Sequence, residues 1–117
     1  MSADPSPEYL DWLARERQWG RRALEMLAEL RASAPRGEHG IDRFALRMSA
    51  VRLTGSVAGW SHNLCAGLAR EGFEAGGDPE PPFLPSDGSA GALEPLERFI
   101  NAKLGLIESA LGNAAGG

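Results

Sequence analysis

His62 and Cys65 are the side chains whose types and spacing come nearest to metal or nucleophile chemistry. They are three residues apart, so a helix places them on neighbouring parts of one surface. Zinc takes three or four ligands, and the other histidine, His39, follows a proline and glycine in a loop with no cysteine nearby. A thiolate nucleophile also needs a third group that orients the imidazole, and no residue is specifically placed for this. We therefore expect no enzyme activity and no cofactor.

Two other chemistry-bearing motifs are incomplete. Glu16 could join His62 in a di-iron bundle, but proteins of that class repeat Glu-x-x-His on two helices and this chain has no such motif. The glycines of LTGSVAG, residues 53–59, lack the lysine and the preceding strand of a phosphate-binding loop. A metal-binding helical bundle or an enzyme thus remains a weaker hypothesis than a binding protein.

Glu16 and Lys103 each occupy a position where the helical pattern predicts an apolar residue. If both side chains are buried, they should form an ion pair that sets the register of their helices, although such a pair adds little net stability. The alternative is that each side chain extends along the bundle edge and keeps its charge in water.

Arginines on helix faces support a nucleic-acid hypothesis. Arg43 and Arg47 are four residues apart on one helix, and Arg15 and Arg22 are similarly placed on another. Residues 12–70 hold ten arginines against five acids, a charge of +5, while the net charge of the chain is −4. The isoelectric point of about 5.1 and the absence of interleaved aromatics oppose the hypothesis. Solvated helix faces, and an arginine bias typical of a GC-rich genome, explain the same pattern.

Length and composition favour one soluble domain. The chain has 117 residues, of which 43% are hydrophobic, enough for one modest core over residues 1–117. No apolar run approaches the length of a membrane span, and MSADPSPEY at the start does not resemble a secretory signal. The single cysteine is consistent with a reducing compartment. We expect a cytoplasmic protein without a membrane partner.

Three helices are predicted, over residues 7–33, 41–71 and 93–111. Ser6 and Pro7 are a typical helix start, Pro35 and Gly37 end the first helix, and Gly112 is expected to end the third. Residues 72–92 hold a long loop rich in proline and glycine. No strand-like alternation occurs, so the fold class is all-α.

The second predicted helix carries two apolar stripes, which indicates neighbours on two sides. One stripe contains Leu46, Ala50, Leu53, Val57, Trp60, Leu64 and Leu68. The other contains Ile41, Phe44, Met48, Val51, Gly55, Ala58, Gly59, His62, Ala66 and Ala69, several of them small. Glycine inside a helix costs about 1 kcal/mol relative to alanine, so its presence suggests that another backbone comes close. We expect a tight helix crossing near Gly59.

These features predict an antiparallel three-helix bundle with a central second helix. The third helix is shorter than the others, which leaves a surplus of apolar surface that we expect dimerisation to bury. The residues expected at an interface are Trp12, Trp19, Gly55, Gly59, Trp60, Phe83 and Leu84. Phe83 and Leu84 are flanked by prolines and could dock on a partner or pin the loop to its own core.

The function predicted from the sequence is a non-catalytic interaction or assembly protein, a small subunit or adaptor. Its partner would be a second copy or another subunit. The alternative is a small subunit of a nucleoprotein complex that contacts nucleic acid through its arginines.

Overall fold

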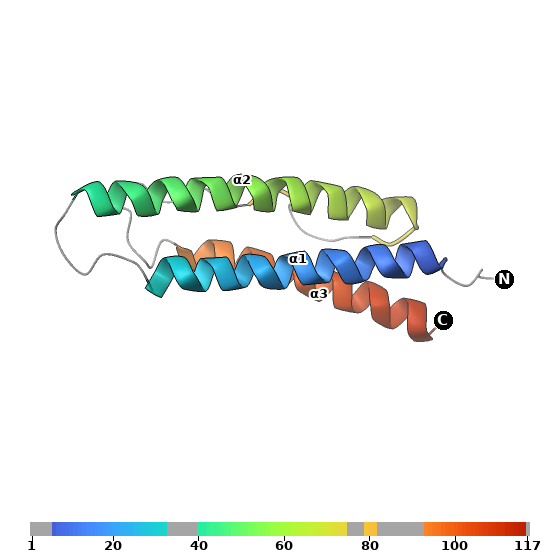
Figure 1. Cartoon of the computed structure of the whole chain (residues 1–117). Helices are drawn as coiled ribbons and strands as arrows, with labels where there is room; N and C mark the ends of the chain where they lie inside the picture. The colour runs from blue at the N-terminus through green and yellow to red at the C-terminus, as the bar shows by residue number, and fades with distance from the viewer. Residues whose placement is uncertain (1–5, 33–39, 75–78, 82–92, 117) are drawn as a thin grey trace.

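The computed structural model describes residues 6–32, 40–74, 79–81 and 93–116, with the side chains of residues 40–46 and 114–116 outside the description. The described residues form three helices and no strand: α1 (Pro7–Ala32), α2 (Gly40–Arg70) and α3 (Glu94–Gly116) (Figure 1). The molecule is a rod of 62 × 20 × 17 Å. The all-α class predicted from the sequence is confirmed.

The start of α1 follows the predicted capping pattern. The backbone N–H of Tyr9 donates to the hydroxyl oxygen of Ser6 at 3.1 Å, which satisfies one of the unpaired N–H groups of the first turn. Pro7 is the first helical residue, where it has no N–H to leave unpaired.

The end of α2 is set by Gly72, whose φ of 80° lies in the left-handed region. The N–H of Gly72 donates to the carbonyl of Ala69 at 3.0 Å, and the N–H of Phe73 donates to the carbonyl of Leu68 at 2.9 Å. This pair of bonds is a Schellman motif. Phe73 then turns back and packs against the core.

The third helix is longer than predicted. It continues through Gly112 to Gly116, whereas the sequence pattern ends it at residue 111. The prediction was wrong because one glycine in a helix costs only about 1 kcal/mol, and the alanines that follow are the best helix formers.

Contacts along the helices show their directions. Arg31 near the end of α1 pairs with Glu97 near the start of α3, and Arg17 pairs with Glu108 further along α3 at 3.4 Å. Trp19 of α1 meets Trp60 of α2. In Figure 1, α1 runs in one direction and both α2 and α3 run in the other.

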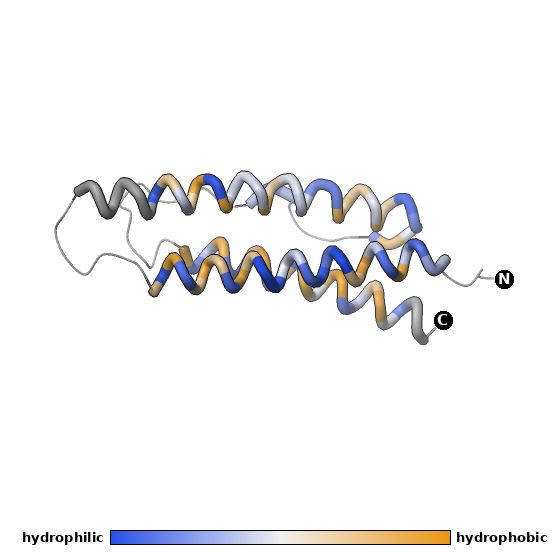
Figure 2. Tube along the Cα trace, in the orientation of Figure 1, coloured by the Kyte–Doolittle hydropathy of each residue, from blue (hydrophilic) through white to orange (hydrophobic). Residues whose placement is uncertain are grey.

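The helix between the other two is α1, and the predicted central position of α2 is wrong. Contacts between α1 and α3 are the most extensive, those between α1 and α2 come next, and α2 and α3 touch least. In Figure 2, hydrophobic and hydrophilic positions alternate along α1 and α3. The core holds Leu13, Ala23, Leu27, Ala50, Leu53, Val57, Trp60, Leu64, Leu68, Leu93, Leu96, Ile100, Ile107 and Ala110.

Only one of the two apolar stripes of α2 is buried. The stripe from Ala50 to Leu68 faces the core, whereas Met48 is 39% exposed and Val51 is 48% exposed on the other stripe. A helix that touches α3 so little has one main neighbour. The small side chains of the second stripe lower the cost of leaving it in water.

Two reciprocal pairs of tryptophan and glycine join α1 to α2. A methyl group added at Gly67 of α2 would lie 2.4 Å from the ring of Trp12 of α1. A methyl group at Gly20 of α1 would lie 2.9 Å from the ring of Trp60 of α2, and 2.6 Å from Leu104 of α3. Each helix therefore supplies one indole and one glycine that makes room for the partner's indole.

The predicted crossing at Gly55 and Gly59 is wrong. Both residues are exposed, and a methyl group at either would meet no atom within 4 Å. The inference that glycines permit close packing was sound for this chain, but the glycines concerned are Gly20 and Gly67.

Substitution by alanine should have opposite effects on stability at the glycines that lie under a ring and at the exposed glycines. Gly67→Ala and Gly20→Ala should each lower the free energy of unfolding by about 1–2 kcal/mol, because an overpacked ring outweighs the gain in helix propensity. Gly55→Ala and Gly59→Ala, the matched controls, should raise it by up to about 1 kcal/mol. Urea denaturation followed by circular dichroism measures all four. A stabilised Gly67→Ala variant would contradict the packing described here.

Candidate interaction groove

Aromatic side chains line the contact between α1 and α2. The rings of Trp19 and Trp60 lie 5.1 Å apart between centroids at an interplanar angle of 30°. Tyr9 stacks on Trp12 at 6.0 Å and 23°. Trp60 is buried, while Trp12 and Trp19 are partly exposed. The aromatic interface residues predicted from the sequence thus lie between two helices of the same chain, with part of two rings still reaching the surface.

Glu16 lies between these aromatic contacts and is partly buried. Burial raises the pKa of its carboxyl, and the indole of Trp60, the guanidinium of Arg15 and the indole of Trp12 offset the shift only in part. The indole N–H of Trp60 does not reach normal hydrogen-bond geometry, since its nitrogen is buried without a hydrogen-bond partner in the described part of the chain.

The structure does not bring Glu16 and Lys103 together. The ion pairs of Arg17 with Glu108 and of Arg31 with Glu97 place Lys103 opposite residues 22–25 of α1, about two turns from Glu16. Lys103 is 3% exposed, and its ammonium lies 5.0 Å from the centroid of the Phe99 ring. The predicted ion pair was wrong because the period of each helix gives its inward face but not the register between helices.

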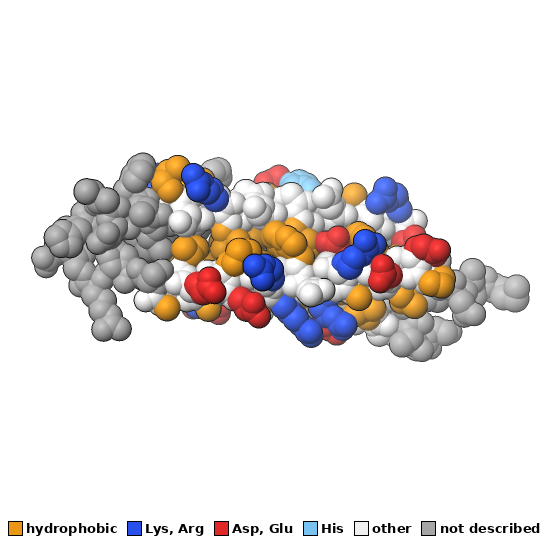
Figure 3. Space-filling view, viewed as in Figure 1, with side chains coloured by type: hydrophobic (Ala, Val, Ile, Leu, Met, Phe, Trp, Pro, Cys, Tyr) orange, Lys and Arg blue, Asp and Glu red, His pale blue; other side chains and the backbone are white. Residues whose placement is uncertain are grey.

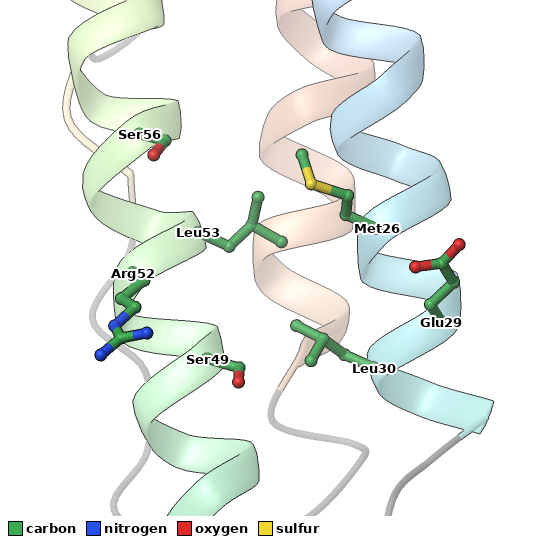
Figure 4. A pocket seen from close by; sticks show the side chains of 7 residues that line it. All are labelled: Met26, Glu29, Leu30, Ser49, Arg52, Leu53 and Ser56. Atoms are coloured by element: carbon green, nitrogen blue, oxygen red, sulfur yellow. The ribbon is translucent and has the colours of Figure 1, made fainter.

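A groove follows the seam between α1 and α2 on the face that Figure 3 shows, where hydrophobic side chains form a band between charged ones. It includes an open cavity of about 440 Å³. The lining residues, shown in Figure 4, are Met26, Glu29, Leu30, Ser49, Arg52, Leu53 and Ser56. Leu53 extends from α2 toward Met26 and Leu30 of α1. The short serines on the α2 edge leave the apolar floor accessible.

Heptad spacing relates the cavity residue Met26 to two tryptophans of α1. Trp12, Trp19 and Met26 are seven residues apart and form one row, because seven residues are close to two helical turns. Trp19 therefore lies on the same edge of α1 as the cavity residue Met26. The aromatic pair of Trp19 and Trp60 continues the apolar floor beyond the cavity.

Charged side chains border the groove. Arg15, Arg22 and Glu29 form a second heptad row on α1, and Arg52 lies on the α2 edge. Arg15 pairs with Asp11 at 3.4 Å in a fully exposed contact. Arg22 and Arg52 are exposed and form no ion pair within the described part of the chain.

Of the four arginines proposed to contact nucleic acid, the three with described side chains do not all lie at the groove. Arg15 and Arg22 share an edge of α1. Arg47 is exposed on α2, but it is five residues before Arg52 and so lies about 140° around the helix from the groove edge. The side chain of Arg43 is outside the described residues.

His62 and Cys65 lie away from the groove, on the exposed side of α2. The imidazole of His62 contacts the carboxylate of Glu80 at 2.5 Å, which ties residues 79–81 to α2. Among the described residues, no three histidine, cysteine, aspartate or glutamate side chains are grouped to hold a metal ion. The predicted interface residues Phe83 and Leu84 lie outside the described residues.

Sequence reasoning missed the α2 side of the groove. Ser49, Arg52, Leu53 and Ser56 were not proposed as interface residues. The available signal was the run of short polar side chains at positions 49, 56 and 63, seven residues apart beside the buried stripe of α2. On the α1 side, the structure places Met26 in the cavity wall.

The fold and the groove define a small helical bundle with one open apolar seam. No protein-family model matches the chain, and the comparisons with curated proteins and with solved structures found no significant match. Within the described residues, none of the helices combines the length and apolar character that crossing a membrane requires.

Glu16 should make stability depend on pH. Because burial raises its pKa in the folded state, the native protein gains stability as the pH falls through that raised pKa and loses it as the pH rises again. Glu16→Gln should therefore raise the free energy of unfolding at pH 7, and the difference should vanish at about pH 3, where the carboxyl is protonated in both states. Urea denaturation at several pH values measures this.

The exposed Glu25 of the same helix provides the matched control, since Glu25→Gln makes the same change of charge at an exposed position of α1. A Glu16→Gln variant less stable than the parent at pH 7 would show that attraction of the carboxylate to its indole and guanidinium neighbours exceeds the cost of burial.

Proposed function

We propose that the protein is a non-catalytic interaction or assembly protein, a small subunit or adaptor, that binds a helix in the groove between α1 and α2. The observation that carries this proposal is the open apolar floor beside Met26, Leu30 and Leu53. In this proposal a helix from a partner completes the antiparallel three-helix arrangement into a four-helix bundle. That partner is a second copy of the chain or another protein.

The character of the lining supports binding rather than chemistry. Four of the seven lining residues are polar, namely Glu29 on the α1 edge and Ser49, Arg52 and Ser56 on the α2 edge, and they flank an aliphatic surface. Apolar grooves bordered by polar groups bind amphipathic helices through residues at i, i+3, i+4 and i+7. Among the described residues that line the cavity, none is a histidine or a cysteine.

A nucleic-acid function is the second candidate, because Arg15, Arg22 and Arg52 border one groove. In that case binding to short DNA or RNA would weaken steeply with added salt and would fall in Arg22→Ala and Arg52→Ala variants. The apolar floor and the carboxylate of Glu29 fit a protein helix better than a phosphate backbone.

Site-specific photocrosslinking tests the proposed surface. With p-benzoylphenylalanine at Ser56 or Ser49, irradiation in the cell of origin should produce one discrete adduct, because the partner helix would cover these positions. The matched control is Ala102, which is exposed on α3 away from the groove. Mass spectrometry of the adduct identifies the partner and the partner residues. Equal yields from Ser56, Ser49 and Ala102 would contradict the proposal.

A further inference from the structure

The charges along the groove restrict its occupant. Arg22 and Arg52 contribute two positive charges that form no ion pair within the described residues, and Glu29 contributes one negative charge, while Asp11 balances the charge of Arg15. Arg22 follows Trp19 by three residues and precedes Met26 by four. This spacing places Arg22 next to both side chains on the surface of α1. Arg52 lines the cavity from the α2 edge, and in Figure 4 its side chain extends along the outer side of that helix. The edges therefore favour an occupant with carboxylates on both sides of an apolar stripe.

The shape of the floor favours a helix of about three turns. Trp19 and Leu30 are eleven residues apart on α1, which corresponds to about 17 Å along the axis. Two antiparallel helices with short side chains at positions 49 and 56 leave a valley into which a third ridge of side chains fits at the usual interaxial distance of about 8–10 Å. An extended peptide would leave backbone N–H and C=O groups without partners against this apolar floor.

A second copy fits these charges poorly. A two-fold dimer brings the same surface onto itself, so the groove of one copy would face Arg22, Arg52 and Glu29 of the other. Arginines that are removed from water next to arginines are unfavourable, and one glutamate per copy does not balance them. An acidic partner would instead be attracted by the same arginines.

We infer that the groove between α1 and α2 binds an acidic amphipathic helix of a different protein. This inference rests on the proposed helix-binding function and names the chemistry of the partner. The partner helix carries apolar residues at i, i+3, i+4 and i+7 against Trp19, Met26, Leu30 and Leu53. Its glutamates or aspartates flank that stripe and face Arg22 and Arg52.

Two synthetic peptides test the charge requirement. Both are helical 18-residue peptides with the same leucine stripe, one with glutamates flanking the stripe and one with lysines in their place. Fluorescence anisotropy with the full chain should show that the acidic peptide binds at least about tenfold more tightly, and that the difference shrinks as salt is added. Equal binding of the two peptides, or tighter binding of the lysine peptide, overturns the inference.

Charge reversal at one position locates the effect. Arg52→Glu should weaken binding of the acidic peptide by about tenfold, because an attraction becomes a repulsion at the groove edge. Arg47→Glu is the matched control, since it makes the same change of charge on an exposed position of the same helix and should alter binding by less than about twofold. Circular dichroism confirms that both variants fold. Equal effects of the two substitutions overturn the inference.

Further measurements separate this inference from the proposed function. Light scattering at micromolar concentration should give the monomer mass of 12.4 kDa. A dimer whose crosslink at Ser56 joins two copies overturns the inference and leaves the helix-binding function in place. Binding of short DNA or RNA in competition with the acidic peptide also overturns it. Absence of binding to either peptide together with absence of a specific crosslink at Ser56 removes both proposals.

Discussion

The packing of each indole against a glycine of the opposite helix is the constraint on which the α1–α2 pair depends. Trp12 occupies the space above Gly67, and Trp60 occupies the space above Gly20. A shift of one helix by a single turn would drive a rigid ring into a Cβ atom, so only one register satisfies both pairs. This register brings Trp19 onto Trp60 and places Met26 beside Leu53. The groove is therefore a consequence of the indole packing.

The central position of α1 follows from its two different faces. One face presents aliphatic side chains to α3, with Arg17 and Arg31 paired to glutamates at the edge of that contact. The other presents the aromatic row to α2. Because α2 and α3 touch each other least, they cover α1 from separate sides, and one edge of the aromatic row stays open. That edge is where the structure accepts a fourth helix in the proposed function.

Local sequence signals predicted the helices well, but they did not predict which helix faces and residues pack against each other. The hydroxyl of Ser6 and the position of Pro7 predicted the start of α1, since capping depends on adjacent residues. Periodicity also showed two stripes on α2, but a stripe does not reveal whether a neighbour covers it. The glycine argument failed at Gly59 for the same reason, because only the folded structure decides which glycine lies under a ring. Of the proposed site residues, Trp19 and Trp60 lie at the groove, while its α2 edge was not predicted.

The two contacts made by α1 respond differently to the ionic composition of the medium. The contact with α3 is edged by the ion pairs of Arg17 and Arg21 with Glu108 and of Arg31 with Glu97, which dissolved electrolyte screens. The contact with α2 is made by aromatic and aliphatic surface, which strongly hydrated anions such as sulfate strengthen. A change of medium thus changes the relative stability of the α1–α2 and α1–α3 contacts. Because α1 takes part in both, it couples them.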